Sequence, residues 1–300
     1  MRDHIQEFGA EPMAEVLSIA PSTYRRHVAM AHDPDLRSRK AKQDEADLAE
    51  IKRIYHDESD GIYGTRKVWH QLKAEGYSIA KCTVERLMQK AGYQGLVRGK
   101  PVITTNPDKA LPCPDDKVNR EFHASYPNQL WVCDFTYVKS WQGDVYVAFV
   151  IDVFARRIVG WKVSTSMTTA FVLDALEQAL HQRRPTSVDG IKPIHHSDRG
   201  SQYMSFKYSE RLEEAGVDMS VGSVGDSYDN ALAESTIGLY KTEVIERIGP
   251  WKSRADVEWQ TARWIKWYNT KRLHSSIGYL TPSQKEEIYL KQQQGYEIAA

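Results

Sequence analysis

Residues 128–164 read NQLWVCDFTYVKSWQGDVYVAFVIDVFARRIVGWKVS, a stretch rich in β-branched and aromatic residues. Within it, residues 128–138, 144–154 and 157–164 form three β-type runs that are separated only by short turns. We therefore expect three consecutive strands that pair as an antiparallel meander.

Alternating elements follow this meander. The sequence predicts a helix, an apolar strand, a second helix, a short strand and a last long helix, at residues 168–183, 193–197, 206–216, 217–222 and from 230 onwards. This order predicts an α/β domain with a mixed five-stranded sheet and helices on its faces. Ribonuclease-H-like topology fits the order.

The composition is that of an ordinary globular protein. Hydrophobic residues make up 41% of the 300 residues, which argues against wholesale disorder. Cys82, Cys113 and Cys133 match neither a disulfide framework nor a zinc-binding spacing, which indicates a reducing compartment. The chain contains no leader-like segment and no apolar run long enough to span a membrane, so we expect a cytoplasmic protein.

Residues 43–100 carry the pattern of a small all-α domain. An amphipathic helix at residues 44–56 precedes helices at 65–76 and 79–91, and a tight turn joins the last two, as in a helix-turn-helix. Residues 61–100 contain eight Lys or Arg against two Asp or Glu, and three of these cations face outward on the last helix: Lys81, Arg86 and Lys90. We expect this helix to contact DNA, although such a charged face is also typical of a solvated surface.

Two further segments complete the organisation. Residues 11–30 predict a helical hairpin in which Pro21 opens the second helix, and its Arg25 and Arg26 either touch DNA or belong to a packing hairpin. Residues 101–118 contain four prolines and no periodicity, which predicts an extended linker. We expect an N-terminal segment, a helix-turn-helix domain, a linker, an α/β core with a C-terminal helix, and a tail, at residues 1–42, 43–100, 101–124, 125–285 and 286–300.

Two aspartates lie in or directly after predicted strands that are otherwise apolar. Asp134 is in the middle of the first strand, where an unpaired charge costs several kcal/mol and needs either a salt bridge or a divalent cation. Asp198 follows the strand at 193–197, where open α/β sheets bind ligands, although an Asp there is also typical of a turn or cap. We expect His195 to face the core and His196 to support the site from behind or to lie next to DNA, because magnesium prefers oxygen ligands.

A third carboxylate, Glu234, lies one turn into the last predicted helix, where the helix dipole also favours an acid. Lys241 is seven residues further along the same face and would suit a phosphate. Four polar residues flank the carboxylates and are further candidates for contacts with phosphate or an unpaired base: Arg199, Gln202, Tyr228 and Asn230.

Asp152 is the main rival carboxylate, because it also lies in an apolar strand. We expect it to have a structural role, hydrogen-bonded to Arg156 or Arg157. Four tryptophans of the C-terminal region are expected to pack in the core rather than to stack on bases: Trp251, Trp259, Trp264 and Trp267.

Together these motifs resemble a known signature. WxxDFTY at Asp134, HHSDRGSQY at Asp198 and DNALAES at Glu234 look like the DD(35)E pattern, with 35 residues between the last two acids and a basic residue seven after the glutamate. YGTRKVWHQL and TVERLMQKAG resemble an integrase-linked helix-turn-helix, and YNTKRLHSSIGYLTPSQ resembles the family's C-terminal signature. Over nearly its whole length the chain resembles OrfB-type bacterial insertion-sequence transposases, whose core is similar to retroviral integrase. The His/Cys zinc module of retroviral integrases is lacking, as in the bacterial branch.

The resemblance implies metal-dependent DNA strand cleavage and strand transfer. It implies two Mg²⁺ ions, with Mn²⁺ able to substitute, one held by Asp134 and Asp198 and the other by Asp134 and Glu234, while Lys241 grips the DNA end. Water would cut at the element's end, and the freed 3′-hydroxyl would attack a second phosphodiester without a catalytic Ser or Tyr.

The resemblance also implies partners. These are the terminal inverted repeats, target DNA, and an upstream OrfA-type protein or a fusion with it, all meeting at the nucleoid. Because two ends must be brought together, we expect a homo-oligomer on DNA, at least a dimer. A DNA-binding regulator descended from a transposase and a general ribonuclease-H-like nuclease are the alternatives; the intact carboxylates argue against the first and the helix-turn-helix against the second.

Overall fold

A computed structural model describes residues 4–97, 123–198, 200, 202–221 and 231–299. The chain divides into two compact units, Met1–Gly95 and Leu96–Ala300. The expected linker at 101–124 lies almost entirely outside the described residues. Among the helices that the structure describes, none is long and apolar enough to cross a bilayer.

The first unit begins with three short helices, α1 (Ile5–Phe8), α2 (Ala10–Val16) and α3 (Pro21–His32). Pro21 occupies the first turn of α3, where its missing N–H costs no hydrogen bond. The helix, turn and second helix predicted for residues 11–30 are confirmed as α2 and α3. In α2 and α3, Ala14 alone is buried, and Arg25 pairs with Glu11 at the surface.

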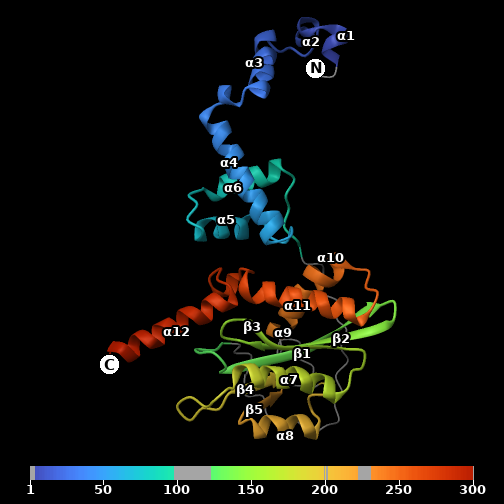
Figure 1. Cartoon of the computed structure of the whole chain (residues 1–300), viewed down its shortest axis with the longest axis vertical. Coiled ribbons are helices and arrows are strands. Elements are labelled where there is room, and N and C mark those ends of the chain that lie inside the picture. The colour runs from blue at the N-terminus through green and yellow to red at the C-terminus, as the bar shows by residue number, and fades with distance from the viewer. Residues whose placement is uncertain (1–3, 98–122, 199, 201, 222–230, 300) are drawn as a thin grey trace. The chain divides into compact units, whose positions relative to one another are not determined.

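The rest of the first unit is a three-helix arrangement of α4 (Arg39–Arg53), α5 (Thr65–Ala74) and α6 (Lys81–Lys90), which Figure 1 shows packed together. A π-helical turn, η3 (Ile54–Glu58), extends α4. The core of this three-helix arrangement is built from apolar residues of α4, η3, α5 and α6: Ile51, Ile54, Val68, Leu72, Val84, Leu87 and Met88. The predicted helix-turn-helix layout is confirmed.

The second unit is built on a five-stranded mixed sheet. Its strands are β1 (Leu130–Ser140), β2 (Gly143–Asp152), β3 (Arg157–Ser164), β4 (Ile194–Ser197) and β5 (Asp218–Val221), in the order β3-β2-β1-β4-β5. The first three strands pair antiparallel, as predicted, while β4 and β5 run parallel to β1.

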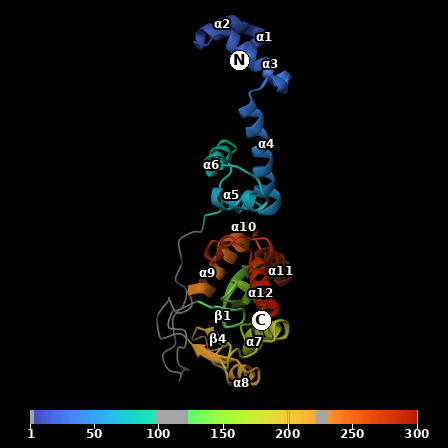
Figure 2. The same ribbon diagram turned by 90° about the vertical axis from the view of Figure 1, so that its left-hand side faces the viewer.

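Helices cover both faces of this sheet (Figures 1 and 2). On one face α7 (Thr169–Arg183) and α8 (Phe206–Glu214) pack against residues such as Cys133 and Val150. On the other, α9 (Ala231–Tyr240) and α11 (Arg254–Thr270) pack against Val132 and Phe149. Consecutive strand residues thus enter different cores, as the two-residue period of a strand requires.

The chain after α9 winds through a π-helical turn, η4 (Lys241–Ile245), and the short α10 (Glu246–Ile248) before α11. A 3₁₀ turn, η5 (Ser275–Ile277), and α12 (Pro282–Ala299) follow. Helix α12 continues through residue 285, where we expected the core to end and a tail to begin. Glu286, on this helix, is buried and accepts hydrogen bonds from Arg157 and Arg183, so this part of α12 belongs to the core.

A buried ion pair fixes the C-terminal region. The carboxylate of Glu243 accepts hydrogen bonds from Arg272 and from the indole of Trp264 at 2.9 Å, and all three side chains are buried. This ion pair joins η4 to the segment after α11. Separating the two segments would leave a buried charge without its partner, which is energetically costly.

Candidate functional site

Parallel pairing of β1 with β4 brings the two predicted aspartates together. The ladder ends with Cys133 opposite Ser197, so the next residues are Asp134, within β1, and Asp198, directly after β4. Asp134 Oδ1 accepts a hydrogen bond from the Phe135 N–H at 2.7 Å, and Asp198 Oδ1 accepts one from the Gly200 N–H at 3.1 Å. Both carboxylates are half-buried.

The electrostatics of this pair favour a cation. Burial, then the negative charges of Asp198 and Glu234, raise the pKa of Asp134 well above its usual value, against the opposing effect of Lys241. Burial also raises the pKa of Asp198, opposed by the Gly200 N–H and by His196. A divalent cation would relieve both the desolvation and the repulsion between the two carboxylates.

Glu234 lies in the first turn of α9, which packs against β1. Its side chain is exposed and acts on Asp134 electrostatically. Within the described ranges, no three His, Cys, Asp or Glu side chains form a group able to hold a metal ion. The structure therefore brings two of the three predicted ligands into adjacent positions and leaves the third nearby on the helix.

The donor chemistry suits a hard cation. Asp134, Asp198 and Glu234 offer only oxygen, which Mg²⁺ prefers. His195 and His196 are both fully buried, and they contact Tyr208 Oη at 3.0 Å and Ser220 Oγ at 2.9 Å respectively. The prediction that His195 faces the core is confirmed, whereas the alternative that His196 lies next to DNA is wrong, because its ring has no exposed surface.

Lys241 follows α9 in η4, with its Nζ 5.9 Å from the centre of the Tyr137 ring. It also lowers the pKa of Asp134, so its charge reaches the carboxylate pair. Gln202 is half-buried and donates a long hydrogen bond of 3.5 Å to the Met167 carbonyl. Three of the predicted substrate contacts lie outside the described residues: Arg199, Tyr228 and Asn230.

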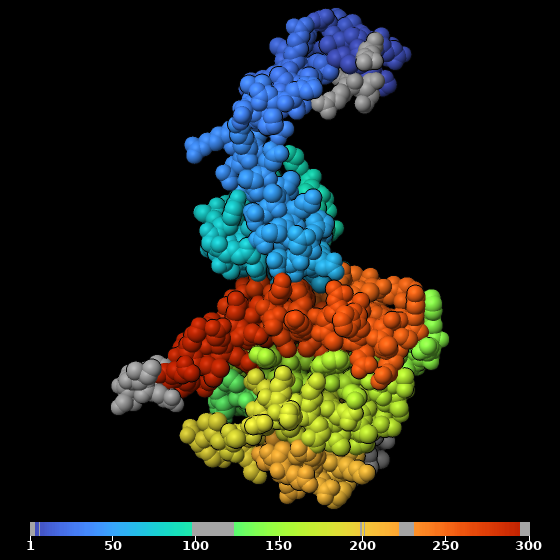
Figure 3. All heavy atoms as spheres, in the orientation of Figure 1, coloured from blue at the N-terminus to red at the C-terminus, as the bar shows by residue number. Residues whose placement is uncertain are grey.

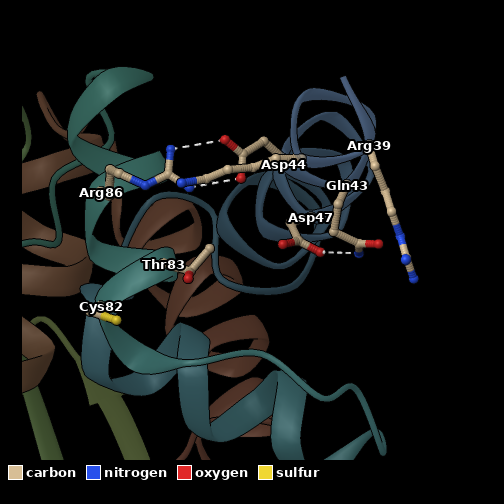
Figure 4. A pocket seen from close by; sticks show the side chains of 8 residues that line it. Arg39, Gln43, Asp44, Asp47, Cys82, Thr83 and Arg86 are labelled. Atoms are coloured by element: carbon tan, nitrogen blue, oxygen red, sulfur yellow. Dashed lines mark hydrogen bonds and ion pairs between the residues drawn. The ribbon is translucent and has the colours of Figure 1, made fainter. Parts of the chain in front are cut away.

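The three cations expected to face outward on α6, Lys81, Arg86 and Lys90, are all exposed. Arg86, however, is engaged: its two terminal nitrogens donate to the two oxygens of Asp44 on α4, at 2.7 and 2.9 Å. Figure 4 shows this pair across a groove between α4 and α6; Arg39 also lines the groove, and its side chain points away from the pair. Any contact of Arg86 with DNA must therefore compete with Asp44.

Asp152 is a structural residue, but not through the partners we expected. Its fully buried carboxylate accepts hydrogen bonds from the N–H groups of Asn128 and Phe154, at 2.8 and 3.0 Å, and from Arg183 at 3.0 Å. The prediction that Arg156 or Arg157 pairs with Asp152 is wrong. Arg157 pairs with Glu286 instead, and Arg183, at the end of α7, pairs with Asp152.

The tryptophan prediction holds in part. Trp251 and Trp264 are buried and Trp267 is half-buried against the same core. Trp259 is 65% exposed, so the expectation that it packs in the core is wrong. At the position of Trp259 in α11, the helical period places the indole ring on the outer face of the helix, away from the sheet.

Sequence reasoning missed two kinds of residue. Asp44 was missed because it pairs with an arginine 42 residues away, a contact that no local pattern encodes. The exposed rings of Tyr137 and Trp141 were missed as well, although both fall on alternate positions of β1 and of its turn and stand out as large aromatic residues at outward positions.

The fold and the positions of the carboxylates together define the structural class of this protein. A mixed sheet in the order β3-β2-β1-β4-β5, covered by helices on both faces, is the ribonuclease-H-like integrase core that we predicted, here with a helical domain before it. Family models described as "Integrase core domain" match residues 124–227 and 215–282, and one described as "HTH-like domain" matches residues 42–101.

Similar proteins of known sequence indicate which family within this class the chain resembles. The transposase for insertion sequence element IS629 of Shigella sonnei is 54% identical over 95% of this chain and 93% of its own length. A putative transposase for insertion sequence element IS986/IS6110 of Mycobacterium tuberculosis (strain CDC 1551 / Oshkosh) is 50% identical, over 93% of this chain and 98% of its own length. Among solved structures, the HTLV-2 integrase catalytic core domain in complex with magnesium matches with a TM-score of 0.42 and 16% identity, over 55% of this chain and 99% of that chain.

The chain belongs to the family of insertion-sequence transposases that carry an integrase core domain. It is thus an enzyme of the transposase and integrase class, which cleaves DNA and transfers strands during transposition.

Proposed function

We propose that Asp134, Asp198 and Glu234 form the catalytic site and hold two divalent metal ions, Mg²⁺ with Mn²⁺ able to substitute. The observation that carries the proposal is the pair of half-buried carboxylates in adjacent positions, Asp134 in the middle of β1 and Asp198 directly after β4, whose pKa values are raised by burial. Two bound ions would stabilise charge on the attacking and leaving oxygens of an in-line displacement. The proposal requires Glu234 to approach the aspartates when ions and DNA bind.

The chain's own residues then orient the DNA. Lys241, whose charge already reaches Asp134, is suited to hold a phosphate beside the carboxylates. In the first step a water oxygen bonds to phosphorus and the bond to the 3′ oxygen breaks, leaving a 3′-hydroxyl. In the second, that hydroxyl bonds to phosphorus in the target strand and a new 3′-hydroxyl leaves. No covalent bond to a Ser or Tyr is involved.

The helix-turn-helix unit supplies binding to the element's terminal inverted repeats, with Lys81 and Lys90 on the exposed face of α6 and Arg86 once it is released from Asp44. Near the carboxylates, the polar side chain of Gln202 contacts the DNA substrate. We propose the same kind of contact for three further residues: Arg199, Tyr228 and Asn230. Target DNA is the second substrate.

The working assembly includes more than this chain. We propose that an upstream OrfA-type protein, separate or fused, and a second copy of the chain join it on DNA at the nucleoid. The reasons are that two element ends must meet and that α1–α3 bury little apolar surface of their own.

Strand cleavage and joining on DNA that carries the element ends tests the proposal. We expect the unaltered chain, with Mg²⁺ and the upstream partner, to cut and join, and Glu234→Gln to lose both activities by at least 100-fold while it still binds the ends. The matched control is Glu246→Gln in α10, which neutralises another exposed glutamate of the same unit and should keep activity. If the unaltered chain and Glu234→Gln both bind ends and neither cuts, the chain is a regulatory DNA-binding protein.

A further inference from the structure

Strand β1 continues beyond Asp134 toward the turn into β2, and it carries two exposed aromatic rings on the way. Tyr137 is 46% exposed and Trp141 is 71% exposed. At about 3.3 Å per residue, they lie roughly 10 and 23 Å along the strand from Asp134. Tyr137, like Phe135, lies at an odd-numbered position of β1, and Trp141 directly follows the last residue of the strand, Ser140.

A lysine from the C-terminal part of the chain lies over each ring. Lys241 Nζ is 5.9 Å from the centre of the Tyr137 ring, and Lys252 Nζ is 6.0 Å from that of Trp141. These distances are within the range of a cation–π contact. We name Tyr137, Trp141, Lys241 and Lys252 the β1 platform.

The outer end of the β1 platform is held by main-chain pairing. The Trp141 N–H donates to the Trp251 carbonyl at 3.0 Å, and Ser140 and Trp251 form a parallel bridge. The Trp251 indole is buried and donates to the Ile245 carbonyl at 3.2 Å, so its neighbour Lys252 is fixed beside the turn. Figures 1 and 3 show the green β1–β2 turn at the surface, next to the orange segment that leads into α11.

We propose that the β1 platform binds an unpaired DNA strand that leads away from the reacting phosphodiester. This deepens the proposed function and rests on Asp134 marking the reacting position. Exposed rings stack on bases of any sequence, and lysines beside them meet the phosphates, which is the combination that single-strand binding surfaces use. A duplex keeps its bases stacked inside, so the rings favour a frayed end over a blunt one.

The chain contains a matched control for this proposal. Trp259 on α11 is exposed to a similar degree, at 65%, and no cation–ring contact within the described residues includes it. If any exposed tryptophan aided DNA binding, Trp259 would do so as well as Trp141.

The test is binding rather than cleavage, so its result does not depend on the metal ligands. The full chain and its variants are titrated, in EDTA, with two fluorescent duplexes that carry the element's end, one blunt and one with about six unpaired thymidines at the reacting end. We expect Trp141→Ala to weaken binding of the forked duplex about ten-fold and of the blunt duplex less than two-fold, and Lys252→Gln to act in the same direction. Trp259→Ala should change neither.

Three results would overturn the proposal: equal weakening of both duplexes by Trp141→Ala, unchanged binding of the forked duplex, or no preference of the unaltered chain for the fork. Retention of cleavage by Glu234→Gln, together with an intact fork preference of the unaltered chain, would contradict the proposed catalytic role but not the proposal for the β1 platform. The experiments therefore distinguish a failure of the β1 platform proposal from a failure of the proposed catalytic site.

Discussion

At the scale of the residue, the sheet contains carboxylates with opposite surroundings. Asp152 is fully buried yet receives two backbone N–H groups and the guanidinium of Arg183. Asp134 and Asp198 receive one backbone N–H each and repel one another. The carboxylate of Asp152 is compensated by partners within the fold, whereas two adjacent carboxylates that are partly buried and repel each other are suited to bind a cation.

Asp152 links stability to pH. Burial, opposed by the Asn128 N–H and Arg183, raises its pKa to about 6, above the usual 3.8. The folded chain then holds this proton more tightly than the unfolded one, so the stability it contributes is full below about pH 4 and is lost as pH rises through about 6. Relative to Asp152→Asn, the unaltered chain should lose roughly 1 to 1.5 kcal/mol of unfolding free energy between about pH 5 and pH 7.5.

Urea unfolding of the unaltered chain and of Asp152→Asn at both pH values measures this difference. A difference that does not change with pH would contradict the raised pKa. The same variant, where folded, should keep its metal-dependent cleavage; complete loss of cleavage with the fold intact would move Asp152 into the catalytic site.

The positions of Asp134 and Asp198 could be predicted because each depends on local pattern, the middle of one strand and the end of another. Arg183 as the partner of Asp152 could not, since it lies 31 residues away and two other arginines were closer in sequence. Trp259 was mistaken because periodicity gives the spacing of a helical stripe but does not say which residue of the stripe turns outward.

At the scale of the element, α4 restrains α6. Asp44 holds both terminal nitrogens of Arg86, the geometry that Arg would otherwise offer to guanine or to a phosphate. In the same groove Asp47 accepts hydrogen bonds from Gln43 and Tyr77, at 2.8 and 3.0 Å, which fixes α4 against the turn between α5 and α6.

We predict that Asp44→Asn strengthens DNA binding, because it removes a negative charge and frees Arg86. Affinity for duplex DNA should rise about three- to ten-fold, and the dependence of log affinity on log salt should steepen by about one. Asp35→Asn is the matched control, because Asp35 is an exposed acid of the same unit that pairs with Lys42, outside the groove. Weaker binding by Asp44→Asn would instead mean that Asp44 orients Arg86 for contact.

Most elements were predictable within a few residues because each follows a clear period bounded by turn residues, as with β3 at 157–164. The π-helical turns η3 and η4 were not predictable, since each spans only five residues, too few to reveal a period different from that of the α-helix it extends. The continuation of α12 past residue 285 depends on Glu286 meeting Arg157 and Arg183, which are distant in sequence.

At the scale of the whole molecule, the chain joins a unit that contains an HTH-like domain to a unit that contains the integrase core domain, and each unit has its own core. A transposition reaction joins two element ends, and one copy of the chain contains one pair of candidate aspartates. We therefore predict that a complex with both ends contains at least two copies of the chain. Mass photometry of the Glu234→Gln chain with end DNA and the upstream partner measures this, and a complex of one chain with two ends would contradict it.

If Asp134, Asp198 and Glu234 hold the metal ions directly, replacing one of these ligands should change which metal ions support cleavage. Asp198→Cys replaces an oxygen ligand with a thiolate, which binds Mg²⁺ poorly and softer ions better. We predict that this variant is inactive in strand cleavage with Mg²⁺ and regains measurable cleavage with Mn²⁺ or Cd²⁺, whereas Asp198→Ala stays inactive with all three. Full activity of Asp198→Cys in Mg²⁺, or equal inactivity with every ion while end binding is kept, would contradict the claim.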